Sequence, residues 1–159
     1  MTGADGDGGT GDAGDTGDDH AGDDTGDRPD ADPEHDYDVL HVPDVDPERS
    51  ATSGTLSVNL TRELDLTEMR SKVRYLEPGD AMTYHRQHEQ EELYYLLAGR
   101  GRMRIGDRDN VVELRAGTAV RVAADTPRQA FNDTDDDQVW LMIGAPPAED
   151  DYRPPPDEA

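Results

Sequence analysis

The sequence predicts one all-β domain, a sandwich or barrel of short strands, preceded by an acidic tail. Three observations lead to this fold class. From Gly54 onward, short apolar runs recur at the regular spacing that is typical of sandwiches and barrels. Clusters of Gly, Pro, Asp and Asn separate these runs and mark turns. The length of 159 residues suits a single domain rather than two.

We expect one strand for each apolar run. The expected strands are Leu56–Leu60, Met69–Leu76, Ala81–His85, Glu92–Leu97, Arg102–Ile105, Val111–Leu114, Ala119–Val122, Gln129–Asn132 and Gln138–Ile143. The pattern also allows a short helix over Thr61–Met69. Residues 37–53 form a Pro- and Asp-rich linker, in which Val39–Val42 either pairs as an edge strand or packs across the domain. The barrel itself is expected over 54–145, with a Pro- and acid-rich tail over 146–159.

The first 36 residues differ sharply in composition from the rest of the chain. They are mostly Asp, Gly and Thr, and they contain nine of the 16 glycines. Their 13 acidic residues against one arginine supply about half of the net charge of −23. Such a segment has no apolar periodicity and little surface to bury, so we expect a disordered polyanionic tail.

The charge of the whole chain limits its partners. There are 38 acidic residues against 15 basic ones, so neither a nucleic acid nor an anionic membrane surface is an expected partner. No apolar run approaches the ~18 residues of a membrane helix. The absence of cysteine excludes disulfides and thiolate chemistry, and with no basic-then-apolar leader we expect a cytoplasmic location. The excess of Asp and the single lysine, Lys72, are typical of halophilic proteins, because high salt screens such repulsion.

The chemistry of the ordered part centres on three residues, His85, His88 and Glu92. Imidazole and carboxylate groups brought together inside a β-barrel are suitable ligands for Fe, Mn, Ni or Zn. The sequence therefore offers a candidate site for one divalent transition metal.

The stretch around these residues resembles the first motif of the cupin superfamily, G-x5-H-x-H-x3,4-E-x6-G. Gly79, His85, Glu92 and Gly99 fall at its spacing. The stretch 117–132 resembles the second motif, G-x5-P-x-G-x2-H-x3-N, through its terminal Gly and Asn. The resemblance covers about residues 54–145 and is to small single-domain cupins of type 2. It implies a double-stranded β-helix, or jelly-roll barrel, whose two motifs hold a metal with three histidines and one glutamate.

Two departures from these motifs leave two hypotheses open. Gln87 stands where the second histidine should be, His88 lies one position late and faces the opposite side of a strand, and Arg128 replaces the last histidine. In one hypothesis, His85 and Glu92 hold the metal with His88 or Gln87, and Arg128 binds an anionic substrate. In the other, no metal is bound, Arg128 pairs with Glu92, and the cavity binds a small molecule or nothing.

The strands around these motifs contain further candidate site residues. Tyr94 has the same strand parity as Glu92, which makes it a candidate ligand-binding residue beside Gln87 and Arg128. Arg100, Arg102 and Arg104 alternate along one predicted strand, a pattern that indicates a solvated face more than an anion site.

Three classes of function follow from these patterns. The leading hypothesis is a cupin-domain protein that binds a small molecule, either anionic or neutral, in the barrel with an absent or atypical metal site. The alternative is a metal-dependent cupin enzyme, either a dioxygenase or an enzyme similar to sugar-phosphate isomerases. A third hypothesis is a non-catalytic interaction module, in which the apolar run Val139–Ile143 supplies the interface of a homodimer.

Overall fold

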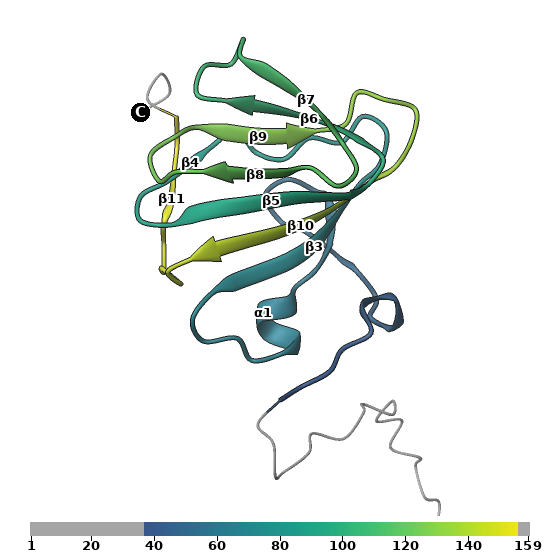
Figure 1. Ribbon diagram of the computed structural model, residues 1–159. Helices are drawn as coiled ribbons and strands as arrows, with labels where there is room; N and C mark the ends of the chain where they lie inside the picture. Colours follow the sequence, from purple (N-terminus) through teal and green to yellow (C-terminus); the bar gives the residue numbers. More distant parts are fainter. Residues whose placement is uncertain (1–36, 156–159) are drawn as a thin grey trace, which may run out of the picture.

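Antiparallel strands close into a barrel in the computed structural model, which describes residues 37–155 (Figure 1). The tail predicted over 1–36 lies outside the described residues. The larger sheet consists, in spatial order, of β1 (Glu48–Arg49), β2 (Leu56–Val58), β3 (Arg70–Leu76), β10 (Gln138–Ala145), β5 (Glu91–Ala98) and β8 (Ala119–Val122). The smaller sheet consists of β7 (Val111–Arg115), β6 (Arg100–Ile105) and β9 (Arg128–Phe131), and β4 (Arg86–Gln87) pairs with β11 (Tyr152–Arg153). The all-β jelly-roll prediction is confirmed.

The core lies between the two sheets, and β10 is its central strand. The inward side chains of β10 include Trp140, which is fully buried and packs in one cluster with Leu96 of β5 and Met103 of β6. The indole ring of Trp140 lies so close to Gly101 that a Cβ atom there would overlap it. A glycine at this position of β6 therefore allows the two sheets to approach each other.

The strand predicted over Ala81–His85 is wrong, because its backbone pairing with β9 is interrupted. Only isolated bridges form there, between Ala81 and Phe131 and between His85 and Arg128. The intervening carbonyl groups accept hydrogen bonds from side chains instead, and that of Thr83 bonds the His85 ring. A regular ladder to β9 therefore cannot form along this segment.

Three other elements differ from the prediction in extent. The helix is one turn, α1 (Leu60–Glu63), and ends before Asp65, whose φ of 47° is left-handed. Because α1 begins at Leu60, the preceding strand stops at Val58. Val39–Val42 forms no strand: a 3₁₀ turn, η1 (Val42–Asp44), begins there around a proline, and β1 pairs with β2 as the edge instead.

The segment after β10 returns to the barrel rather than leaving it as a tail. Residues 146–155 pass back to β4, where β11 adds a two-residue strand (Figure 1). The carboxylate of Asp151 accepts hydrogen bonds from three successive backbone amides, those of His88, Glu89 and Gln90, at 2.7–3.0 Å. The C-terminal segment therefore fixes the loop that follows Gln87.

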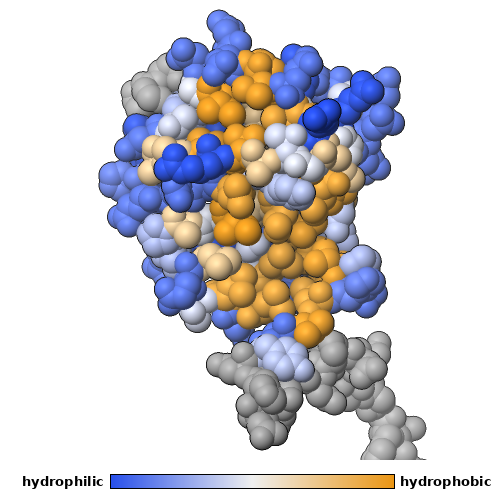
Figure 2. Space-filling view, viewed as in Figure 1, coloured by the Kyte–Doolittle hydropathy of each residue, from blue (hydrophilic) through white to orange (hydrophobic). Residues whose placement is uncertain are grey.

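The outer face of the larger sheet is apolar. The outward side chains of β10 are Val139, Leu141 and Ile143, and Leu93 and Leu97 of the adjacent β5 are 40% and 46% exposed. Figure 2 shows a continuous hydrophobic band along this side of the molecule. Extended apolar patches of this kind are uncommon on monomers and mark interaction surfaces. None of the helices in residues 37–155 could span a bilayer.

We predict that substitution of Asp151 by Asn lowers stability and weakens its dependence on acid. Burial raises the pKa of Asp151, but the three amides outweigh burial and hold the pKa below its ordinary value. A depressed pKa stabilises the fold above the unfolded value of about 3.9, and this contribution is lost as the pH falls through the folded pKa. Asp151→Asn should cost about 2 kcal/mol of unfolding free energy at pH 7. Urea denaturation at pH 7 and pH 3.5 measures both effects.

Asp150→Asn is the matched control, because Asp150 is exposed and its carboxylate accepts no backbone amide of residues 37–155. The Asp151→Asn variant should lose more stability than this control at pH 7, and the difference should shrink toward pH 3.5. Equal losses of stability in the two variants at both pH values would show that the hydrogen bonds from the three amides to Asp151 do not stabilise the fold.

The apolar outer face leads us to predict a homodimer. Leu93→Glu places a charge at the centre of the band, beside Ile143 of β10, and should convert the dimer to a monomer. Multi-angle light scattering measures the mass directly. Ala51→Glu, at an exposed turn outside the band, is the control and should leave the mass unchanged. A monomeric parent protein would refute the prediction.

Candidate functional site

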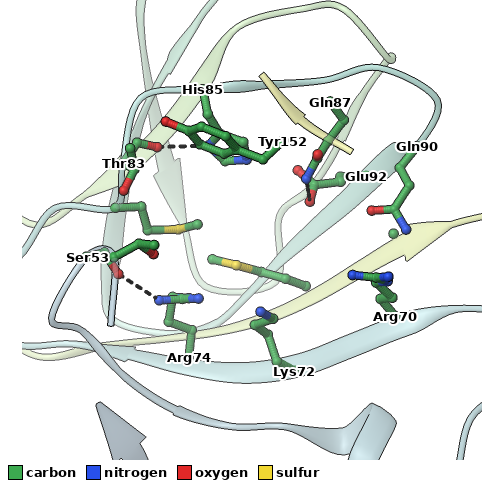
Figure 3. A pocket seen from close by; sticks show the side chains of 14 residues that line it. Ser53, Arg70, Lys72, Arg74, Thr83, His85, Gln87, Gln90, Glu92 and Tyr152 are labelled. Carbon is green, nitrogen blue, oxygen red and sulfur yellow. Dashed lines mark hydrogen bonds between the residues drawn. The ribbon is translucent and has the colours of Figure 1, made fainter. Parts of the chain in front are cut away.

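A cavity of about 200 Å³ opens at the end of the barrel where β4 and β11 lie. Figure 3 shows two facing rows of polar side chains, one from β3 and one from the segment 83–92. Met82 and Met142 supply apolar surface between the rows, and Tyr152 and Ser53 contribute from the C- and N-terminal segments. Both terminal segments therefore help to form the site.

One wall of the cavity is a row of cations. Arg70, Lys72 and Arg74 occupy alternate positions of β3, so all three face the barrel interior. The intervening Ser71 and Val73 are buried on the other side of the strand. Exposure falls along the row, from exposed Arg70 through half-buried Lys72 to buried Arg74.

Burial and mutual repulsion act together on these cations. Burial lowers the pKa of Lys72, and the nearby Arg74 and Arg70 lower it further, while Glu92 opposes the shift. One end of the Arg74 guanidinium is fixed, since Nη1 donates to Ser53 Oγ at 3.2 Å and to Thr55 Oγ1. Its buried Nε has no hydrogen-bond partner among the described residues. The row therefore carries unsatisfied positive charge.

A buried ion pair lies on the other side of the cavity. Arg128 of β9 is fully buried, and its Nε donates to Glu92 Oε2 of β5 at 2.9 Å. The Tyr94 hydroxyl donates to the same oxygen, and Gln87 Nε2 donates to Oε1 at 3.2 Å. Burial raises the pKa of Glu92, but Arg128, Tyr94, His85 and Gln87 outweigh it and leave the pKa below its usual value. Glu92 is therefore an ionised carboxylate whose charge is balanced by Arg128.

His85 is held in one tautomer by the backbone. The Thr83 carbonyl can only accept a hydrogen bond, so the Nδ1 atom 2.8 Å away must be the donor. Burial lowers the pKa of His85, although Thr83 and Glu92 oppose the shift, so the ring is neutral at pH 7. Nε2 then retains a lone pair, and the ring stacks on Tyr152 with centroids 5.4 Å apart.

The structure separates the predicted site residues into three groups. His85, Gln87 and Glu92 line the cavity. Arg128 and Tyr94 lie behind its wall, where they bond Glu92 instead of facing a ligand. His88 is exposed and does not line the cavity.

The β3 cations and Tyr152 were missed by the sequence analysis. The alternation of Arg70, Lys72 and Arg74 along a predicted strand was a usable signal, the same one that was noted for the exterior arginines of β6. Alternation does not show which face of a strand points inward, so the sequence could not distinguish the cations of β3 from the arginines of β6. Tyr152 gave no signal, because its position depends on the return of the C-terminal segment.

The residues present do not fit the metal centre that the cupin resemblance implies. Among residues 37–155, no three His, Cys, Asp or Glu side chains gather closely enough to hold an ion. Both carboxylate oxygens of Glu92 already accept hydrogen bonds, one of them from a guanidinium. Arginine has no lone pair to offer, and its charge repels a cation. Only two potential metal ligands in the cavity wall, His85 and Glu92, remain, whereas catalytic zinc sites have about three protein ligands.

We predict that breaking the ion pair from one side destabilises the barrel strongly. Arg128→Met leaves Glu92 largely buried without a counter-ion, which should cost about 3 kcal/mol of unfolding free energy. The double variant Arg128→Met/Glu92→Leu removes both charges and should recover part of this loss. Guanidinium denaturation of the single and double variants measures the coupling. Additive losses would show that the two side chains do not stabilise each other.

Comparisons with known proteins agree with this architecture. The sequence model of the family described as "Cupin domain" matches residues 72–144. No curated protein matches the chain significantly.

Several solved structures are similar. One is a putative sugar phosphate isomerase from Acidithiobacillus ferrooxidans, with 25% identity and a TM-score of 0.54 over 59% of this chain and 60% of that one. This chain thus spans only about three fifths of that relative's length. Another is a predicted oxalate decarboxylase from Thermotoga maritima, with 18% identity and a TM-score of 0.60 over 69% and 99% of the two chains.

A Cupin 2 conserved barrel domain protein from Salinispora arenicola is also similar, with 13% identity and a TM-score of 0.60 over 70% of this chain and 90% of that one. Identities this low show the fold alone. Together with the family match and the strand topology, they lead to one conclusion: this chain has a barrel of the cupin fold, and residues 72–144 of it match the Cupin domain.

Proposed function

We propose that this cupin barrel binds a small anionic molecule, which the cations of β3 attract and hold. One observation carries the proposal. The chain has a net charge of −23 and a single lysine, yet this lysine and two arginines line the same cavity. A positive cavity in a strongly negative protein attracts small anions locally, because contacts inside a cleft are screened less than charges on the surface.

The charge balance of the cavity supports this proposal. Among residues 37–155, Glu92 is the only acidic residue in the cavity wall, and Arg128 already pairs with it. The charges of Arg70, Lys72 and Arg74 therefore remain without a counter-ion in the wall. A bound anion would relieve the repulsion that lowers the pKa of Lys72, so binding and charge neutralisation would reinforce each other.

The name of one similar structure, a putative sugar phosphate isomerase at 25% identity, is consistent with an anionic ligand. Sugar phosphates are anions. The ion pair between Arg128 and Glu92 occupies the place where the family motifs set metal ligands. We therefore propose anion binding without a transition metal, and the metal-dependent enzyme becomes the alternative outcome of the test.

We predict that inorganic phosphate or oxalate raises the melting temperature of the full chain. Lys72→Gln removes one cavity cation and should weaken binding by about tenfold or more, in line with the 1.5–3 kcal/mol of a charged hydrogen bond. Calorimetric titration measures the affinity. Arg121→Gln removes the same charge from an exposed pair with Glu91 and should bind anions like the parent.

Elemental analysis of the protein purified without added chelator completes the test. A stoichiometric transition metal that disappears in His85→Ala would support the metal-dependent alternative. Anion affinity that is equal in the Lys72→Gln variant, the Arg121→Gln variant and the parent would refute the proposed site.

A further inference from the structure

The cations of the cavity are spread along a line rather than gathered at one point. Alternate residues of a strand lie about 6.7 Å apart, so the three side chains of β3 start from well-separated positions. A single phosphate group is compact and is usually held by converging donors, often backbone amides of a glycine-rich loop or a helix N-terminus. The lining of this cavity contains neither feature. The row suits two anionic groups that are separated along a short carbon chain.

The facing wall presents acceptors instead of donors. Gln87 Nε2 donates to Glu92, which fixes the amide orientation and turns Oε1 away from the carboxylate. This Oε1 has no hydrogen-bond partner among the described residues. His85 Nε2 retains its lone pair because Nδ1 carries the proton. Both groups need a donor, and a ligand hydroxyl would supply one.

The row of cations on β3 also contains a hydrogen-bonding group without a partner among the described residues, the Nε–H of Arg74. Arg74 is 6% exposed, Nη1 is anchored by the two hydroxyls, and the Nε–H has no acceptor. Arg74 and Gln87 line opposite walls of the cavity, and each carries a buried polar atom without a partner among the described residues (Figure 3). With Nη1 anchored, the Nε edge of a guanidinium matches the planar oxygen pair of a carboxylate.

From this polarity we infer that the ligand is a small hydroxydicarboxylate, with its carboxylates on Arg74 and Lys72 and its hydroxyl on Gln87 and His85. The inference rests on the proposed anion-binding function and narrows it to one chemical class. A cavity of about 200 Å³ has room for a small acid of this class.

Calorimetric titration of the full chain with four probes tests the inference. L-Malate has two carboxylates and a hydroxyl, succinate lacks the hydroxyl, lactate lacks the second carboxylate, and glycerol 3-phosphate replaces both carboxylates by one phosphate. Malate should bind at least tenfold more tightly than each of the others. Titration with D-malate shows whether the site distinguishes the two enantiomers by the position of the hydroxyl. The enantiomer that binds more tightly is then used in all later titrations.

Two variants assign the two ends of the ligand. Gln87→Met keeps the size of the side chain but removes the acceptor, so malate should weaken about tenfold while succinate stays unchanged. Arg74→Gln should weaken malate and succinate alike, and Lys72→Gln replaces it if thermal unfolding shows that the Arg74 variant does not fold. Arg121→Gln again serves as the control with unchanged affinity.

The outcomes separate this inference from the function on which it rests. Equal affinities for malate and succinate, or a preference for glycerol 3-phosphate that depends on Lys72, would overturn the hydroxydicarboxylate and leave anion binding in place. Failure of all four probes and of inorganic phosphate to bind would overturn both.

Discussion

The contact between the Arg128 guanidinium and the Glu92 carboxylate is the constraint on which the site depends. It joins β9 of the smaller sheet to β5 of the larger sheet in the interior of the barrel. A buried charge must be paired, so each side chain fixes the position of the other. The backbone of Arg128 also exchanges two hydrogen bonds with His85, at 2.7 and 3.1 Å. One residue thus sets the carboxylate, the imidazole and their separation.

Neutralising Glu92 changes what the rest of the cavity can do. With its charge cancelled, the electrostatic character of the cavity comes from β3, where alternate positions bring three cations inward. The facing wall then offers hydrogen-bond acceptors without a net charge. The two terminal segments complete the opening: Ser53 anchors Arg74, and Tyr152 covers the ring of His85. The cavity is polarised because different strands supply its two walls.

The distribution of charge gives a physical role to the unusual composition. Salt at molar concentration shortens the screening length to roughly 3 Å, which removes repulsion between distant surface carboxylates. Contacts inside the barrel are about that short and largely excluded from solvent, so they persist under the same conditions. A protein with a net charge of −23 can therefore keep cations together in a cavity at high salt.

The sequence alone determined the fold class, most strands to within one or two residues and the set His85, Gln87, Glu92 and Arg128, because strand periodicity and motif spacing are local properties. The strand predicted over 81–85 was wrong, since the Met82 carbonyl accepts a hydrogen bond from the distant Gln129 side chain, and a local pattern contains no information on such a contact. Only the tertiary structure decided that Tyr94 and Arg128 lie behind the wall, that His88 faces solvent, and that the β3 row, not the β6 row, lines the cavity. Which face of a strand turns inward depends on how the sheets close, and no single strand contains that information.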